Sequence, residues 1–225
     1  MASQVFSTSK ETRFSPQIHD TIVSPRVYNL TIGAVVVYGL VINYIICKYF
    51  SDTFIQMNPL ILIIGYFVSA IAGTLIVARS HSPFISFLGY NLVVVPLGAM
   101  LSTCLYAYDP AIIFQACGLT ASVTVIMMCL GALFPQAFAR MGRGLFISLI
   151  ILIIVGIVSM FLPGLYSLYS YAGAAIFSLY IAYDWVRANQ YVKTLDNAVD
   201  SACDIYVDII NLFLHILAIL GRSDD

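Results

Sequence analysis

Seven runs of predominantly apolar residues dominate this chain, and each is long enough to cross a lipid bilayer as a helix. About 20 apolar residues in a helix span the hydrocarbon core. Runs of this size lie at 27–50, 59–78, 83–106, 111–134, 144–161, 167–186 and 201–220. The short alternating segments that are typical of a membrane β-barrel are not seen in the sequence. The sequence therefore predicts an all-α integral membrane protein with seven transmembrane helices.

The charge content indicates that lipid is the main solvent of this chain. Charged residues make up 9% of the 225 residues and hydrophobic residues 61%, whereas a soluble domain carries about 25% charge. The formal net charge of -1 gives no basic footprint for nucleic acid. The five cysteines stand singly in apolar runs, without the spacing of a metal site, and are expected to be packing residues.

The positive residues between the runs predict the orientation in the membrane. Residues 1–26 are polar, lack the short apolar core of a signal peptide, and are expected to form a cytoplasmic N-terminal tail. Residues 27–220 would form the seven-helix transmembrane domain and residues 221–225 a short C-terminal tail. Eight of the ten Lys and Arg residues fall on the side of the N-terminus, which the positive-inside rule assigns to the cytoplasm. Seven spans then place the C-terminus outside, unless the last run re-enters the membrane instead of crossing it.

Two aspartates inside the predicted spans are the strongest functional signal. Asp184 lies near the end of the sixth run, about two turns inside the expected cytoplasmic boundary of that helix, and Asp208 lies about two turns after the start of the seventh run. Six or seven residues correspond to about 9–10 Å of helix, so consecutive antiparallel helices would bring both acids to one depth. Two carboxylates in contact at low dielectric cannot both ionise at small cost. We therefore expect the pair to share a proton near neutral pH. The alternative for Asp184 is an ordinary helix-end acid that pairs with Arg187.

Further polar residues surround this pair in the sequence. Asp200, Asp204 and Asp208 recur every fourth residue and would form one acidic face of the last helix, followed by Asn211. Such oxygen ligands suit Ca²⁺ or a cation path, although a solvated helix start is an equally simple explanation of the first two. Arg79 closes the second run on the same side and is a candidate counter-charge, or else an ordinary positive-inside residue.

The motifs around the two aspartates resemble those of the Bax inhibitor (transmembrane Bax-inhibitor-motif) family. The runs FSLYIAYDW and IYVDIINLF place the aspartates 24 residues apart, and the C-terminal ILGRSDD and Arg79 after the second run match as well. The chain is most similar to the bacterial YetJ-type members, which are pH-sensitive calcium leak proteins. The resemblance implies a seven-helix fold with the last helix central, and a di-aspartyl pH sensor of Asp184 and Asp208 with Arg79 as its latch. Asp204 departs from the family pattern, in which we expect a small or neutral residue, so a dyad and a triad both stay open.

The resulting prediction is a passive, pH-gated Ca²⁺ or cation leak protein without enzymatic turnover. We expect it in a bacterial plasma membrane, with lipids, Ca²⁺ and protons as its partners. We expect no cofactor, and Asp184 and Asp208 are candidate ligands for Ca²⁺ as it passes. The sequence does not identify a protein partner and is compatible with a monomer. A proton-coupled secondary transporter is the alternative, because buried acids also form proton relays. An intramembrane aspartyl protease is less well supported, because the GxGD and Pro-Ala-Leu motifs of such enzymes are missing.

Overall fold

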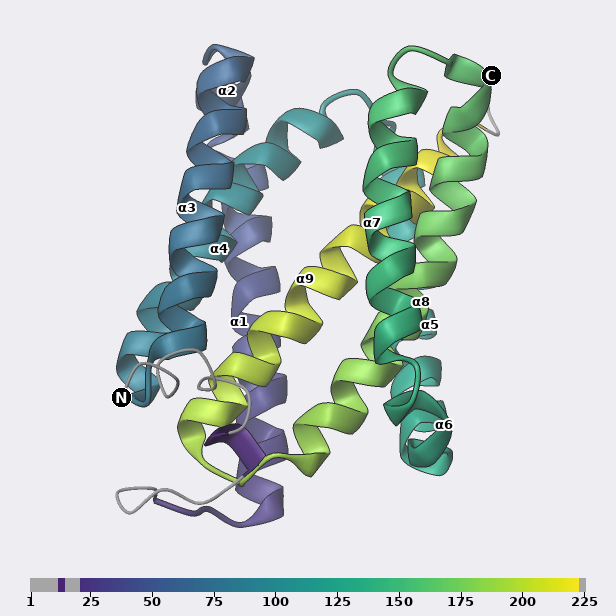
Figure 1. Ribbon diagram of the computed structural model, residues 1–225. Coiled ribbons are helices and arrows are strands. Elements are labelled where there is room, and N and C mark those ends of the chain that lie inside the picture. Colours follow the sequence, from purple (N-terminus) through teal and green to yellow (C-terminus); the bar gives the residue numbers. More distant parts are fainter. Residues whose placement is uncertain (1–11, 15–20, 223–225) are drawn as a thin grey trace, which may run out of the picture. The chain divides into compact units, whose positions relative to one another are not determined.

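The described part of the chain folds largely into helices (Figure 1). Prolines at the first helical position begin most of these helices. The computed structural model describes residues 12–14 and 21–222. Within this part of the chain α1 covers Pro25–Tyr49, α3 Pro59–Arg79, α4 Pro83–Leu105 and α5 Pro110–Leu133. The missing N–H of proline costs nothing at this position, and its fixed φ suits a helix. The side chains of Ser24, Asn58 and Asp109 cap α1, α3 and α5 by accepting hydrogen bonds from backbone N–H groups.

The remaining long helices are α7 (Gly142–Ser159), α8 (Tyr166–Gln190) and α9 (Leu195–Leu220). Seven long helices therefore form where seven runs predicted them, and the all-α prediction is confirmed. Six of them are both long and apolar enough to cross a membrane; α8 is 25 residues long but is less apolar. Two short helices, α2 (Ser51–Ile55) and α6 (Pro135–Ala139), were not predicted. The short 3-10 helices η1 (Thr12–Phe14) and η2 (Pro163–Leu165) complete the list for the described residues.

The exposed surface of the long helices is apolar. The most apolar window of α3 has a mean hydropathy of 2.5, yet only 11% of it is buried within the protein. A surface of this kind needs lipid as its solvent, and a helix satisfies its own backbone hydrogen bonds there. Helix α9 is the most buried of the candidate spans, with 67% of its window covered. The central position that the resemblance implies for the last helix stays a prediction.

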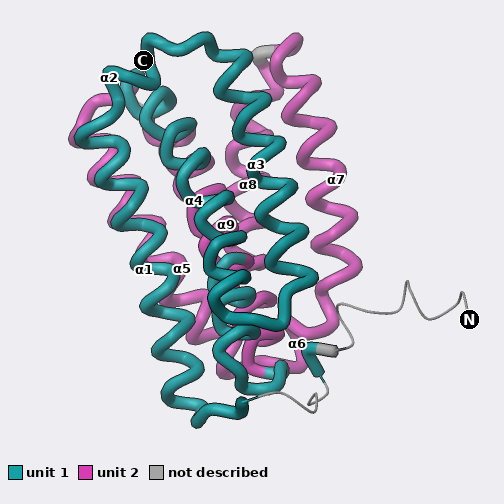
Figure 2. Tube along the Cα trace, turned by 90° about the vertical axis from the view of Figure 1, so that its left-hand side faces the viewer, with its two compact units in different colours: residues 1–107, 190–203 teal, residues 108–189, 204–225 magenta. Residues whose placement is uncertain are grey.

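The chain divides into two compact units, which Figure 2 shows in different colours. Unit 1 consists of residues 1–107 and 190–203, and unit 2 of residues 108–189 and 204–225. Within unit 1, α4 packs against both α1 and α3. Tyr90 of α4 is fully buried and its hydroxyl donates to the Val35 carbonyl of α1 at 3.0 Å. Unit 2 contains α5, α6, α7, η2 and α8, and α9 contributes residues to both units.

The last helix begins six residues earlier than predicted, at Leu195 instead of residue 201. Thr194 is the N-cap, because its hydroxyl accepts a hydrogen bond from the backbone N–H of Asn197 at 3.1 Å. The predicted seventh run began at residue 201 and so left residues 195–200 in the gap before it. The structure places this segment in α9 and buries its polar residues: Asp196, Asn197 and Asp200 are all buried. Asp208 therefore lies thirteen residues after the start of α9, about 20 Å along it.

Several predictions fall outside what the structure describes. Lys10 and the final Ser-Asp-Asp lie outside the described residues, and so does most of the N-terminal tail. The cytoplasmic side, the outward C-terminus and the domain limits at residues 26 and 220 stay predictions.

Candidate functional site

Asp184 and Asp208 both belong to unit 2, and their side chains lie close to one another there. Asp184 lies on α8, six residues before the helix ends, and Asp208 lies on α9. Of the charged groups around the Asp208 carboxyl, Asp184 acts on it most strongly, and the two side chains lie close together. Asp204, one turn earlier on α9, is a weaker neighbour. The two helices thus bring at least two carboxylates to one place.

The environments of the two carboxylates differ. Asp208 is buried, and within the described residues its Oδ2 has no hydrogen-bond partner. Asp184 is 13% exposed, and its Oδ1 lies 3.8 Å from Nη1 of Arg187, one turn later on α8. The Arg187 guanidinium also lies over the ring of Tyr183, 5.3 Å from its centroid. The helix-end ion pair considered for Asp184 is therefore present, and it coexists with the contact to Asp208.

The other residues predicted for the site are divided between the two units. Arg79 is the last residue of α3, belongs to unit 1 and is exposed. Asn211 of unit 2 donates from Nδ2 to the Val207 carbonyl at 2.8 Å, one turn back on α9. Asp200 belongs to unit 1, is 2% exposed, and its Oδ2 lies 2.6 Å from Nη2 of Arg13. A solvated helix start is thus wrong for Asp200. The latch role of Arg79 and the cation path along Asp200, Asp204 and Asn211 stay predictions.

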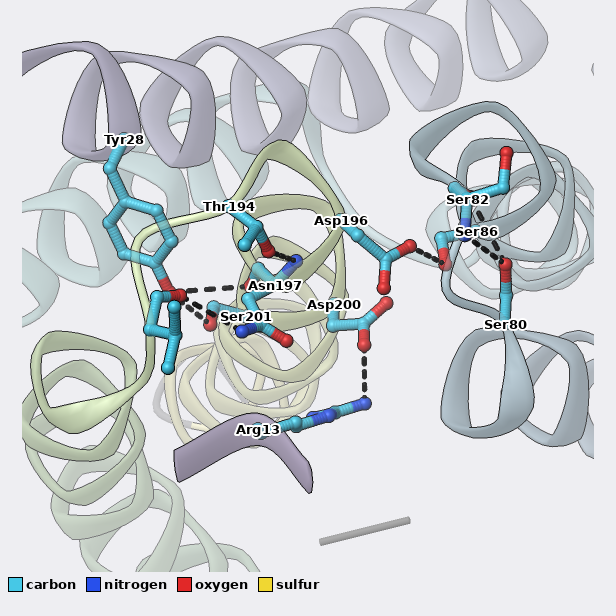
Figure 3. Close-up of polar contacts among 11 residues, drawn as sticks. Arg13, Tyr28, Ser80, Ser82, Ser86, Thr194, Asp196, Asn197, Asp200 and Ser201 are labelled. Atoms are coloured by element: carbon cyan, nitrogen blue, oxygen red, sulfur yellow. Dashed lines mark hydrogen bonds and ion pairs between the residues drawn. The ribbon is translucent and has the colours of Figure 1, made fainter. Parts of the chain in front are cut away.

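A polar cluster around the start of α9 in unit 1 was not predicted (Figure 3). The Ser86 hydroxyl of α4 lies 2.8 Å from Oδ1 of Asp196 and donates to it. The Tyr28 hydroxyl of α1 lies 3.2 Å from the Ser201 hydroxyl and 3.4 Å from the Asn197 carbonyl. Tyr28 and Ser86 are fully buried. The sequence did contain a signal for this cluster. Asp196 lies four residues before Asp200 and extends the series of aspartates at every fourth residue by one helical turn.

His215 is packed among aromatic rings in unit 2. Its ring lies 4.8 Å from that of Tyr169 and is stacked on Phe177, with 5.6 Å between centroids. A Cβ at Gly173 would collide with the imidazole, so the glycine makes room for the ring. The surroundings of His215 are those of a packing residue.

The described residues contain no cluster of three or more His, Cys, Asp or Glu side chains arranged to hold a metal ion. The Asp184–Asp208 pair can bind a proton, or contact a cation that passes, but it supplies too few ligands for a resident Ca²⁺ site, which takes six to eight oxygens. The expected absence of a cofactor stays a prediction.

The fold and the pair define a multi-span α-helical membrane protein with two carboxylates in contact inside it. The chain belongs to the Bax inhibitor family: the family model described as "Inhibitor of apoptosis-promoting Bax1" matches residues 21–225. This match confirms the resemblance that the two aspartate motifs indicated.

Individual relatives come from distant organisms. A protein of Helicobacter pylori (strain ATCC 700392 / 26695) is 36% identical over 116 residues, which are 50% of this chain and 49% of the relative. A protein of Borreliella burgdorferi is 30% identical over 203 residues, 86% of each chain. Bax inhibitor 1 of Schizosaccharomyces pombe is 27% identical over 170 residues, 74% of this chain and 64% of the relative. The chain thus spans about half the length of the Helicobacter pylori protein that it matches, and most of the Borreliella burgdorferi protein.

Proposed function

We propose that this protein is a passive leak for Ca²⁺, or for cations more generally, and that protonation of the Asp184–Asp208 pair controls the leak. The observation that carries the proposal is the contact between these two carboxylates within unit 2, one of them buried. Ca²⁺ is the transported ion here, and the protein performs no chemical turnover. The choice of Ca²⁺ as the ion rests on the family resemblance, and the control by protons rests on the Asp184–Asp208 pair.

The physical basis of the control is the charge of the pair. Two ionised carboxylates in a low-dielectric interior repel one another strongly, and a single proton held between them removes most of that repulsion. Arg187 offsets the charge of Asp184 only at 3.8 Å and near the protein surface. In the described part of the chain, Asp208 forms no ion pair. Loss of the shared proton would therefore add a charge that needs a new partner.

Two candidate partners for the added charge follow from the sequence. Arg79 would hold the closed state as a counter-charge, in the role that the family resemblance gives it. A Ca²⁺ ion that moves along Asp200, Asp204 and Asn211 would be the other. The competition between a fixed guanidinium and a mobile cation makes the leak depend on pH, because both compete for the same carboxylates.

The test is Ca²⁺ flux into liposomes that contain the purified protein, with a Ca²⁺ gradient imposed and with pH varied from 5 to 9. We expect flux down the gradient that changes with pH and that stops when the Ca²⁺ gradient is removed. Protein-free liposomes give the background. Flux that is indistinguishable from this background at every pH would refute the proposal. Accumulation of Ca²⁺ against its gradient, driven by an imposed pH difference, would show a proton-coupled transporter instead.

We further expect the bacterial plasma membrane as its location, with the N-terminus in the cytoplasm. The positive-inside distribution supports this orientation.

A further inference from the structure

The N-terminal segment of unit 1 contacts the connection between α8 and α9. The Arg13 guanidinium forms an ion pair with Asp200, with 2.6 Å between Nη2 and Oδ2. The Arg13 carbonyl accepts a hydrogen bond from the backbone N–H of Val192 at 2.9 Å. The ring of Phe14 meets that of Tyr191 edge-on, with 4.9 Å between centroids. One tail residue thus binds both the connection and the second turn of α9.

A second group of contacts ties the tail to the same connection just before α1. Ile22 and Thr194 form an antiparallel β-bridge, and the Val23 N–H donates to the Lys193 carbonyl at 2.8 Å. The Lys193 ammonium lies over the Tyr28 ring, 4.5 Å from its centroid. We call Arg13, Phe14, Ile22 and Val23, with the residues 191–194 and Asp200 that they contact, the N-terminal clasp.

A few polar contacts, and not the burial of apolar surface, stabilise the clasp. Ile22 is 63% exposed and Phe14 47% exposed, so the tail buries little apolar surface here. Asp200 is 2% exposed, and a buried carboxylate that loses its charged partner is strongly destabilised. Arginine stays protonated at any physiological pH, whereas burial lowers the pKa of the Lys193 ammonium. Arg13 is therefore the dependable counter-charge of the clasp, and its removal would weaken the whole contact.

We propose that the N-terminal clasp is an autoinhibitory device that holds the first turns of α9 in the low-leak arrangement, with the Arg13–Asp200 ion pair as its lock. This proposal rests on the leak function proposed above. Asp200 lies two turns before Asp208 on one continuous helix, about 12 Å along its axis. A displacement of the start of α9 would therefore move the carboxylate that senses protons.

The first experiment compares Arg13→Gln with Arg26→Gln. Both substitutions remove one positive charge from the same end of the chain, but Arg26 is exposed and lies outside the clasp. We expect Arg13→Gln to raise Ca²⁺ flux into liposomes several-fold at a fixed pH, Arg13→Lys to restore most of the difference, and Arg26→Gln to match the wild type. Equal flux in Arg13→Gln and Arg26→Gln would overturn the proposal.

A second experiment locks the clasp covalently. The residues of the Ile22–Thr194 bridge face one another, and Cα atoms in such an antiparallel pair lie about 4.5–5.5 Å apart, within the range of a disulfide. The double variant Ile22→Cys with Thr194→Cys should show lowered flux under oxidising conditions, with recovery after reduction. Each single variant is the control. A disulfide that forms, as shown by mass spectrometry, but leaves flux unchanged would overturn the proposal.

A third readout separates this proposal from the leak function itself. Cys203 is buried one turn after Asp200, and its reaction with a membrane-impermeant maleimide can be followed after the other four cysteines are replaced by alanine. We expect faster labelling of Cys203 in Arg13→Gln than in Arg26→Gln. If the wild type and Arg13→Gln both pass no Ca²⁺, the leak function fails, and faster labelling would still support the clasp as a lock on α9. Equal labelling in the two variants would refute the lock.

Discussion

Gly73 of α3 and Gly89 of α4 allow these two helices to approach closely within unit 1. A Cβ added at Gly73 would lie 2.5 Å from the Gly89 carbonyl oxygen and 3.0 Å from Cβ of Leu92. A Cβ added at Gly89 would lie 2.9 Å from both the Gly73 carbonyl oxygen and Cγ2 of Ile76. Close backbone approach at small residues is a main source of helix association in membranes. Gly73→Ala should therefore force α3 and α4 apart.

The magnitude follows from two opposing effects. Overpacking of this kind costs about 1–3 kcal/mol, and alanine regains about 1 kcal/mol of helix propensity relative to glycine. Gly65→Ala on the same helix is the matched control, because a Cβ there meets nothing within 4 Å. We expect the free energy of unfolding of Gly73→Ala to fall about 1–3 kcal/mol below that of Gly65→Ala, since the propensity gain cancels in this comparison.

The assay is equilibrium unfolding by SDS titration in mild detergent, followed by circular dichroism. The double variant Gly73→Ala with Gly89→Ala should lose less than the sum of the single losses, because both residues relieve the same contact. Equal stability of Gly73→Ala and Gly65→Ala would refute the close approach of α3 and α4.

Three further predictions concern orientation, gating and the polar cluster of unit 1. A reporter fused after Asp225 should read as extracytoplasmic and one fused before Lys10 as cytoplasmic; a cytoplasmic C-terminus would favour six spans with a re-entrant last segment. Arg79→Ala should raise Ca²⁺ flux at alkaline pH, where both acids of the pair are ionised, and unchanged flux would reduce Arg79 to a topology residue. Ser86→Ala removes the hydroxyl that donates to buried Asp196 at 2.8 Å and should lower the free energy of unfolding by about 1–3 kcal/mol. The control is Ser82→Ala, which should lower it much less, because the Ser82 side chain makes no cap hydrogen bond to α4.

Local signals made the helices largely predictable from the sequence. The predicted run 59–78 differs from α3 by one residue at its end, and the predicted start of α4 at Pro83 is correct. Both starts combine a proline with a preceding polar residue, which fixes a helix boundary without tertiary information. The start of α9 was missed because its first turn is polar, and only the contacts with Ser86, Tyr28 and Arg13 explain its burial. Those contacts are tertiary, so the hydropathy of the sequence does not reveal them.

The candidate site was predictable only in part. Asp184 and Asp208 lie on consecutive helices, so chain order alone favours their meeting, but the expectation of equal depth fails: Asp184 lies about 9 Å from the end of α8 and Asp208 about 20 Å after the start of α9. The Arg13–Asp200 ion pair joins residues that are 187 positions apart, from 13 to 200; Asp200 belongs to the series of aspartates at every fourth residue, but nothing in the sequence pairs it with Arg13. The relation of Arg79 to the pair also depends on tertiary arrangement and stays a prediction.

The most direct test of the central claim is a double-mutant cycle on the pair, measured as Ca²⁺ flux into liposomes between pH 5 and 8. Asp184→Asn and Asp208→Asn each remove one acid with little change of shape, and Asp52→Asn, on exposed α2, is the control. If the two carboxylates share one proton, each single variant should flatten the pH dependence of flux, and the double variant should do little more than either alone. Additive effects of the two substitutions, or a pH dependence that persists in the double variant, would show that the pair is not the proton sensor.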